Sequence, residues 1–81
     1  MLNLNVQTKT KPEDVVKKAV QFFGPGGYKL NVVHQEASWA EFEGGGGGVR
    51  VVTKPNDKGT SVDIETREWE YQVKEFAGKL K

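Results

Sequence analysis

The chain has 81 residues, of which 36% are hydrophobic and 28% are charged, and its formal net charge is +1. This composition is typical of one small globular domain and excludes a disordered or fibrous chain. The small net charge disfavours a polyanionic partner held by bulk charge. Because the chain contains no cysteine, disulfides, thiolate metal sites and cysteine nucleophiles are excluded. We expect a single domain over residues 1–81.

The first residues, MLNLNVQTK, alternate apolar and polar side chains. They lack the basic region and the apolar region of a signal peptide. No apolar run in the sequence approaches the length that a membrane span requires. Together with the absence of cysteine, these features predict a cytoplasmic protein that has no membrane partner.

The first half of the chain predicts a strand, a helix and a second strand. Leu2–Thr8 alternates with period two, as a half-buried strand does. The apolar residues of Val15–Phe23 follow helical spacing, and Pro12 suits the first turn of that helix. The sequence GPGG then ends the helix. Tyr28–His34 alternates again and predicts the second strand.

The second half of the chain predicts three more strands and a helix. Trp39–Glu43, Val49–Thr53 and Thr60–Thr66 read as strands. A turn signal, Pro55–Gly59, separates the last two of them. Trp69–Leu80 carries an apolar stripe at helical spacing and predicts an amphipathic helix.

The resulting order is β-α-β-β-β-β-α, which predicts an α+β fold. Four consecutive strands favour an antiparallel sheet, and we expect both helices to pack on one face while the other face meets water. The core-facing positions are apolar apart from Thr8, Thr53, Thr60 and Thr66. This set offers no acid or base, so we expect no catalytic residues.

Five consecutive glycines, Gly44–Gly48, raise the possibility of a phosphate-binding loop. Such a loop opens a helix and ends in Lys-Ser or Lys-Thr, whereas this run opens a strand. Placing Phe42 opposite Val49 leaves a four-residue hairpin loop at Gly44, Gly45, Gly46 and Gly47. We expect this loop to be mobile. The alternative is that the loop and Arg50 contact a ligand or an anion.

The same register places charged residues on the outer side of the sheet. Glu41 faces Arg50 across the glycine hairpin, and in the next hairpin we expect Arg50 to face Asp63. The guanidinium would then bridge the two carboxylates in water.

One apolar row interrupts this charged face. We expect Val33 to lie opposite Trp39 and Trp39 opposite Val52, so that three apolar side chains lie side by side. Such a row is either an ordinary cross-strand cluster or a contact surface for a protein partner, of which a second copy of the chain is the simplest.

Histidine chemistry and metal binding find little support in the sequence. A triad of Ser38, His34 and Glu36 would need three residues of one short turn to reach one another, so we expect His34 to be structural or exposed. One histidine without cysteine disfavours a zinc site. The turn NDKG lacks the alternating ligands and the terminal glutamate of a calcium loop. We expect no metal and no cofactor.

The order of elements resembles that of the helix-grip and TATA-binding-protein-like folds. The stretch EGGGGGVRV also resembles the glycine-rich loop of Bet v 1-like (START-related) helix-grip proteins. By that resemblance Glu43 stands at the acidic position, Gly44–Gly48 at the glycines and Arg50 at the basic position. The helix-grip likeness implies a small apolar ligand. The TATA-binding-protein likeness implies nucleic-acid binding through the open sheet, which the acidic residues on that face disfavour.

We therefore expect a small non-enzymatic binding or interaction module, whose partner is a protein, a second copy of the chain or a small apolar ligand. Two alternatives are a minimal helix-grip enzyme of the cyclase or dehydratase type and a weak nucleic-acid binder. An enzyme would require an enclosed pocket that holds a polar side chain.

Overall fold

The computed structural model describes residues 2–80 of the chain. It confirms the α+β prediction and the order of its seven elements. In chain order these are β1 (Leu2–Thr8), α1 (Pro12–Phe23), β2 (Asn31–Gln35), β3 (Trp39–Gly44), β4 (Gly47–Asn56), β5 (Gly59–Arg67) and α2 (Glu70–Leu80).

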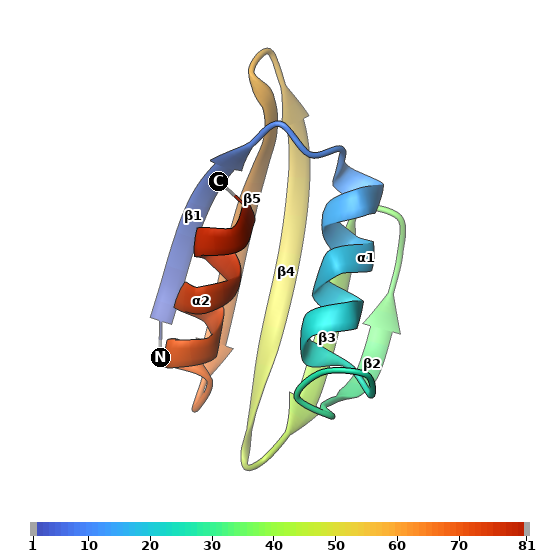
Figure 1. The fold of residues 1–81 in the computed structure, drawn as a ribbon, viewed down its shortest axis with the longest axis vertical. Coiled ribbons are helices and arrows are strands. Elements are labelled where there is room, and N and C mark those ends of the chain that lie inside the picture. Colours follow the sequence, from blue (N-terminus) through green and yellow to red (C-terminus); the bar gives the residue numbers. More distant parts are fainter. Residues whose placement is uncertain (1, 81) are drawn as a thin grey trace.

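The five strands form one antiparallel sheet in the order β1-β5-β4-β3-β2. β1 therefore pairs with the last strand of the chain, and β2 lies at the opposite edge. Both helices lie on one face of the sheet, as predicted (Figure 1). We call the uncovered side the outer face.

The second strand begins three residues later than predicted, because the chain wraps around the end of α1. The backbone amides of Tyr28 and Leu30 donate to the carbonyls of Phe22 and Phe23 at 3.0 and 2.8 Å. Lys29 has a φ of 66°, a left-handed conformation that a strand does not contain. Tyr28 consequently belongs to the helix end and not to the sheet.

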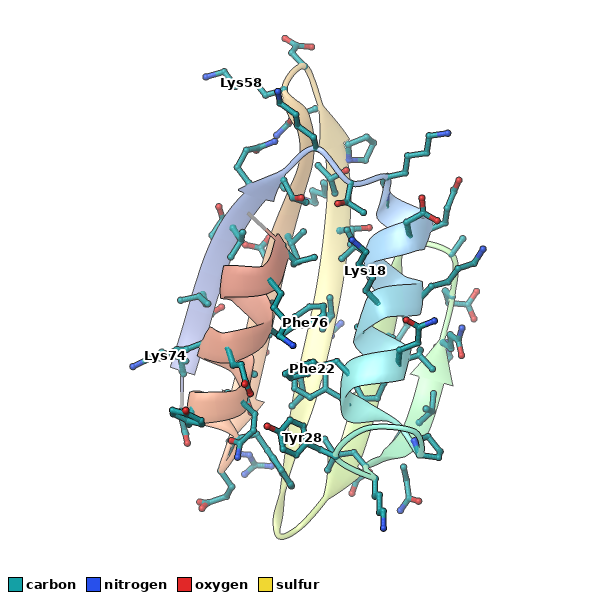
Figure 2. The ribbon with its side chains drawn as sticks, viewed as in Figure 1. Lys18, Phe22, Tyr28, Lys58, Lys74 and Phe76 are labelled. Atoms are coloured by element: carbon teal, nitrogen blue, oxygen red, sulfur yellow. The ribbon has the colours of Figure 1, made fainter. Side chains whose placement is uncertain are left out.

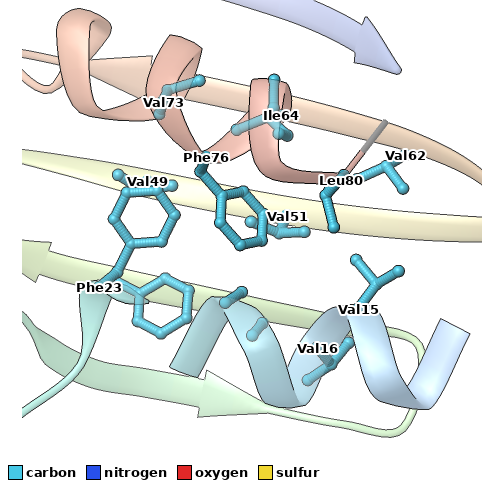
Figure 3. Packing of buried hydrophobic residues seen from close by; sticks show 14 of the residues in the cluster. Val15, Val16, Phe23, Val49, Val51, Val62, Ile64, Val73, Phe76 and Leu80 are labelled. Atoms are coloured by element: carbon cyan, nitrogen blue, oxygen red, sulfur yellow. The ribbon is translucent and has the colours of Figure 1, made fainter. Parts of the chain in front are cut away.

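The core lies between the two helices and the sheet (Figure 3). Helix residues such as Phe23 and Phe76 pack over Val51 and Ile64 of the central strands, and each of these side chains is almost fully buried. Burying a side chain of this size contributes about 1.5–3 kcal/mol of stability. The helical stripe predicted for α2 is confirmed, because Val73, Phe76, Ala77 and Leu80 are all buried.

Four buried threonines are the polar residues of this core. Each hydroxyl donates to a backbone carbonyl, so no hydroxyl is left without a partner. Three of these bonds tie a loop or the end of α2 to the sheet, and the fourth, from Thr66 to Gly48, joins β5 to β4. The pairs are Thr8 with Leu80 at 2.6 Å, Thr53 with Ser38 at 2.6 Å, Thr60 with Thr10 at 2.6 Å, and Thr66 with Gly48 at 2.7 Å.

The predicted register of β3 against β4 is confirmed, but that of β4 against β5 is wrong by two residues. Arg50 faces Glu65 and not Asp63. The turn is tighter than the sequence suggested, because Asn56 pairs with Gly59 and its side-chain oxygen accepts the amide of Lys58 at 3.0 Å.

The predicted four-residue glycine loop is also wrong. Gly44 pairs with Gly47, so the turn contains only Gly45 and Gly46. These two residues have φ angles of 58° and 83°, the left-handed values that a tight hairpin turn requires.

The glycine hairpin packs against the chain that joins β5 to α2. The indole nitrogen of Trp69 donates to the carbonyl of Gly44 at 2.9 Å. A Cβ atom on Gly45 would lie 2.8 Å from the ring of Trp69, and one on Gly47 would lie 2.0 Å from the carbonyl oxygen of Arg67. Glycine is thus required at Gly45 and Gly47 for close approach, whereas Gly46 has open space around it.

We predict that Gly47→Ala lowers the free energy of unfolding more than Gly46→Ala does. The first change drives a Cβ into backbone, whereas the second costs only the left-handed conformation, about 1–2 kcal/mol. Gly26, which also has open space around it, is the control, and Gly26→Ala should leave stability unchanged or raise it by up to about 1 kcal/mol. Urea unfolding measures all three variants. Equal stability of Gly47→Ala and Gly26→Ala would contradict this packing.

Candidate functional site

The outer face is built from alternate residues of all five strands. The strand registers arrange these residues in rows that cross the sheet. One row contains Asn3, Glu65, Arg50, Glu41 and His34, and the next contains Asn5, Asp63, Val52 and Trp39.

Trp39 is the centre of an aromatic and cationic stack on this face. The imidazole of His34 lies parallel to the indole, with 4.4 Å between ring centroids and 11° between planes. The guanidinium carbon of Arg50 lies 5.4 Å from the centroid of the Trp39 ring, within the range of a cation–π contact. Val52 faces Trp39 across the ladder, as predicted. We call His34, Trp39, Arg50 and Val52 the Trp39 stack.

Val33 does not join this stack, and its predicted place opposite Trp39 is wrong. A β-bulge between Val32 and His34 shifts the register, so that His34 faces Glu41. Val33 lies at the bulge and is 49% exposed. Sequence reasoning missed His34 as a neighbour of Trp39, because a bulge has no residue signature comparable to Gly or Pro in a turn.

The side chains around the stack have partners other than those predicted. His34 Nε2 lies 3.0 Å from a carboxylate oxygen of Glu36. Asp63, the predicted partner of Arg50, instead accepts a hydrogen bond from the side chain of Asn5 at 2.7 Å. Within residues 2–80 the guanidinium of Arg50 forms no ion pair. Its predicted bridging role is therefore wrong, and Arg50 shields the indole.

A hollow of about 590 Å³ lies beside the stack on the outer face. It exists because Gly48 has no side chain to stand between Glu43 on β3 and Arg67 on β5. Of the residues predicted as a loop site, Gly44, Gly46, Gly47 and Arg50 line the hollow, whereas Gly45 contacts Trp69. Its charged rim consists of Glu41, Glu43, Arg50, Glu65 and Arg67.

A second concave site lies between the two helices, on the side remote from the sheet. This groove has a volume of about 340 Å³. Phe22 of α1 and Phe76 of α2 meet in it with their ring centroids 5.3 Å apart, and Figure 2 shows both rings between the helices. The remaining lining residues are Lys18, Gln21, Lys79 and Leu80. This groove was not predicted from the sequence, although Phe22 and Phe23 are two consecutive aromatic residues of one helix turn.

Tyr28 lies at one end of the row of aromatic rings between the helices. Its ring packs edge-on against Phe22 at 5.3 Å between centroids, and its hydroxyl donates to a carboxylate oxygen of Glu75 at 2.9 Å. The hydrogen bond to Glu75, with desolvation and the carboxylate charge, raises the pKa of Tyr28 above the ordinary value of 10.0. The segment after α1 is thereby fastened to α2.

We predict that this contact makes stability depend on pH in the alkaline range. A raised folded-state pKa means that the stabilisation is fully present below the unfolded pKa, about 10, and is lost as the pH rises through the folded-state value. The free energy of unfolding should therefore fall above pH 10 more steeply in the native sequence than in Tyr28→Phe. In a Tyr71→Phe background, ultraviolet titration follows Tyr28 alone, and Glu75→Gln should lower its midpoint. An unchanged midpoint would contradict the assignment.

Within the described residues, no helix is long and apolar enough to cross a membrane. The same residues include no cluster of three or more His, Asp or Glu side chains placed to hold a metal ion.

The fold is a small α+β arrangement with a hollow on the outer face and a groove between the helices. No family model matches the chain, and no curated protein matches it. Among solved structures, the chain is similar to the crystal structure of the protein SSP2350 from Staphylococcus saprophyticus, with a TM-score of 0.61 and 17% sequence identity. The match covers 95% of this chain and 78% of the other. At this level of identity the likeness shows the fold alone.

Proposed function

We propose that this domain is a non-enzymatic interaction module that binds a second copy of itself through the outer face of the sheet. The observation that carries the proposal is the Trp39 stack. Tryptophan and arginine are the residues most enriched among the energetic anchors of protein interfaces. Here His34 and Arg50 hold the indole in one orientation, so that little side-chain freedom remains to be lost on binding.

A second copy suits this face because the face complements itself. A two-fold interface requires one patch to match its own image. The outer face carries the Trp39 stack and, beside it, the hollow at Gly48. A two-fold axis near Arg50, which belongs to both features, would seat each Trp39 in the hollow of the other copy. The guanidinium of Arg50 would then meet the carboxylates that rim the hollow, such as Glu43.

The dimensions of the molecule are adequate for such a contact. Its principal extents are 37, 21 and 16 Å. A face bounded by the two longer extents is comparable in size to the roughly 800 Å² per partner that a standard interface covers. Pairing of strands along the β2 edge is a poorer route, because β2 has five residues and carries a bulge, both of which protect an edge.

The chemistry of the core supports binding in preference to catalysis. Its polar residues are four threonines, each of which already donates to a carbonyl. The described acids and bases lie instead on the surface, whereas an active site holds such groups in an enclosed pocket. The mixture of acids and bases on the outer face also suits a protein partner better than a nucleic acid.

We predict that the native protein forms dimers at high concentration and that Trp39→Ala prevents this. Loss of a central tryptophan typically costs about 2 kcal/mol or more of binding energy, which weakens the dimer by roughly thirtyfold or more. Sedimentation equilibrium over a range of concentrations measures the dissociation constant, and circular dichroism checks that the variant is folded.

Tyr71→Ala is the matched control, because Tyr71 is an aromatic residue of α2 that is 74% exposed and lies on the covered side of the sheet. This variant should associate as the native protein does. A native protein that remains monomeric at millimolar concentration, or an equal effect of the two substitutions, would overturn the proposed function.

A further inference from the structure

The groove between α1 and α2 combines an apolar floor with a basic rim. Phe76 and Leu80 are 2% and 4% exposed, and Phe22 packs partly buried between them and Tyr28. Lys18 and Lys79, one from each helix, line the groove beside this floor. Apolar surface beside fixed positive charge is complementary to a molecule that has an apolar chain and one anionic end.

The two lysines are available to such a ligand. Within residues 2–80 neither ammonium group forms an ion pair. The Nζ atom of Lys79 instead lies 5.2 Å from the centroid of the Phe22 ring, so the charge is held over the floor of the groove by a cation–π contact. Glu75, a carboxylate of the same helix, is engaged with the hydroxyl of Tyr28.

The groove also has a direction. In Figure 2, Phe76, Phe22 and Tyr28 follow one another between the helices, and Lys18 lies at the opposite end of this row from Tyr28. Tyr28 bounds the apolar end, because its hydroxyl is fastened to α2 and its ring abuts Phe22. On binding, the Lys79 ammonium would leave the Phe22 ring and meet the anionic end of the ligand beside Lys18. The apolar chain would then lie along Phe22.

The size of the groove restricts the ligand further. Its volume of about 340 Å³ stands at the lower end of the roughly 300–1,000 Å³ that ligand sites span. This space suits one alkyl chain and not a double-chained lipid. The groove is also distinct from the space between sheet and helices, which core side chains occupy.

We propose that the groove between α1 and α2 binds a free single-chain amphiphile with one anionic head group, such as a medium-chain carboxylate. The head group pairs with Lys18 and Lys79, and the chain covers the accessible part of Phe22, which packs on Phe76. This site is independent of the self-association proposed above, because it lies on the opposite side of the sheet.

Calorimetric titration with sodium decanoate below its micelle concentration tests the proposal. Decanoate should bind, whereas decyltrimethylammonium, which has the same chain and the opposite charge, should not. Butyrate should bind far more weakly than decanoate, because it covers less apolar surface. Amide shifts on decanoate binding should concentrate in residues 18–22 and 76–80. Shifts confined to the outer face, or equal binding of the anionic and cationic ligands, would overturn the proposal.

Charge reversal separates the groove from general electrostatic attraction. Lys18→Glu combined with Lys79→Glu should weaken decanoate binding by about tenfold or more, since two opposite-charge contacts become like-charge contacts. The matched control reverses two lysines that do not line the groove, Lys58 at a hairpin turn and Lys74 on α2 (Figure 2). Lys58→Glu with Lys74→Glu has the same net charge and should bind as the native protein does. Equal loss in both double variants would overturn the site.

A vesicle experiment distinguishes a free ligand from a membrane surface. Vesicles of phosphatidylglycerol present anionic head groups whose chains are held in the bilayer. The protein should not co-sediment with them at the ionic strength at which decanoate binds. Co-sedimentation that Lys18→Glu with Lys79→Glu abolishes would assign the two lysines to a membrane surface and overturn the proposal.

Discussion

The burial of a single face of the sheet is the constraint on which the rest of the structure depends. A chain of 81 residues has enough apolar side chains for one layer of core, and both helices are used to cover it. The outer face of the sheet is therefore exposed to solvent, and so are the sides of the two helices that point away from the sheet. Both candidate sites follow from this single-layer core. One lies on the uncovered face of the strands, and the other lies between the two helices that cover the opposite face.

The fold could be predicted from the sequence because period-two and helical spacing record which side of each element is buried. The same information fails where two registers bury the same residues. Val51 is equally apolar opposite Val62 or Ile64, and Arg50 meets an acid opposite either Asp63 or Glu65, so the pattern could not distinguish them. The hydrogen bond from the amide of Lys58 to the side chain of Asn56 decides in favour of the tighter turn.

The candidate sites were less predictable because they depend on irregular backbone and on contacts between distant segments. Trp39 and Val52 follow from the glycine hairpin register, and their adjacency was predicted. His34 reaches Trp39 only through a bulge, and Arg50 turns to the indole instead of an acid. The run of glycines suggested a mobile loop, but the glycine hairpin packs against Trp69 and Arg67. These two residues lie about twenty positions further along the chain, and no local sequence pattern connects them to the glycines.

The pairing of β1 with β5 has a consequence for how the chain acquires this structure. β1 is made early, but among the described strands it pairs with β5 alone, and the hydroxyl of Thr8 donates to the carbonyl of Leu80. On the ribosome, β1 must wait until nearly all the rest of the domain has emerged, whereas β3, β4 and β5 are joined by two short turns and can pair at once. Closing a loop of this length opposes rapid folding. The meander is therefore expected to nucleate the domain, and the N-terminal strand to complete it as the final step of its maturation.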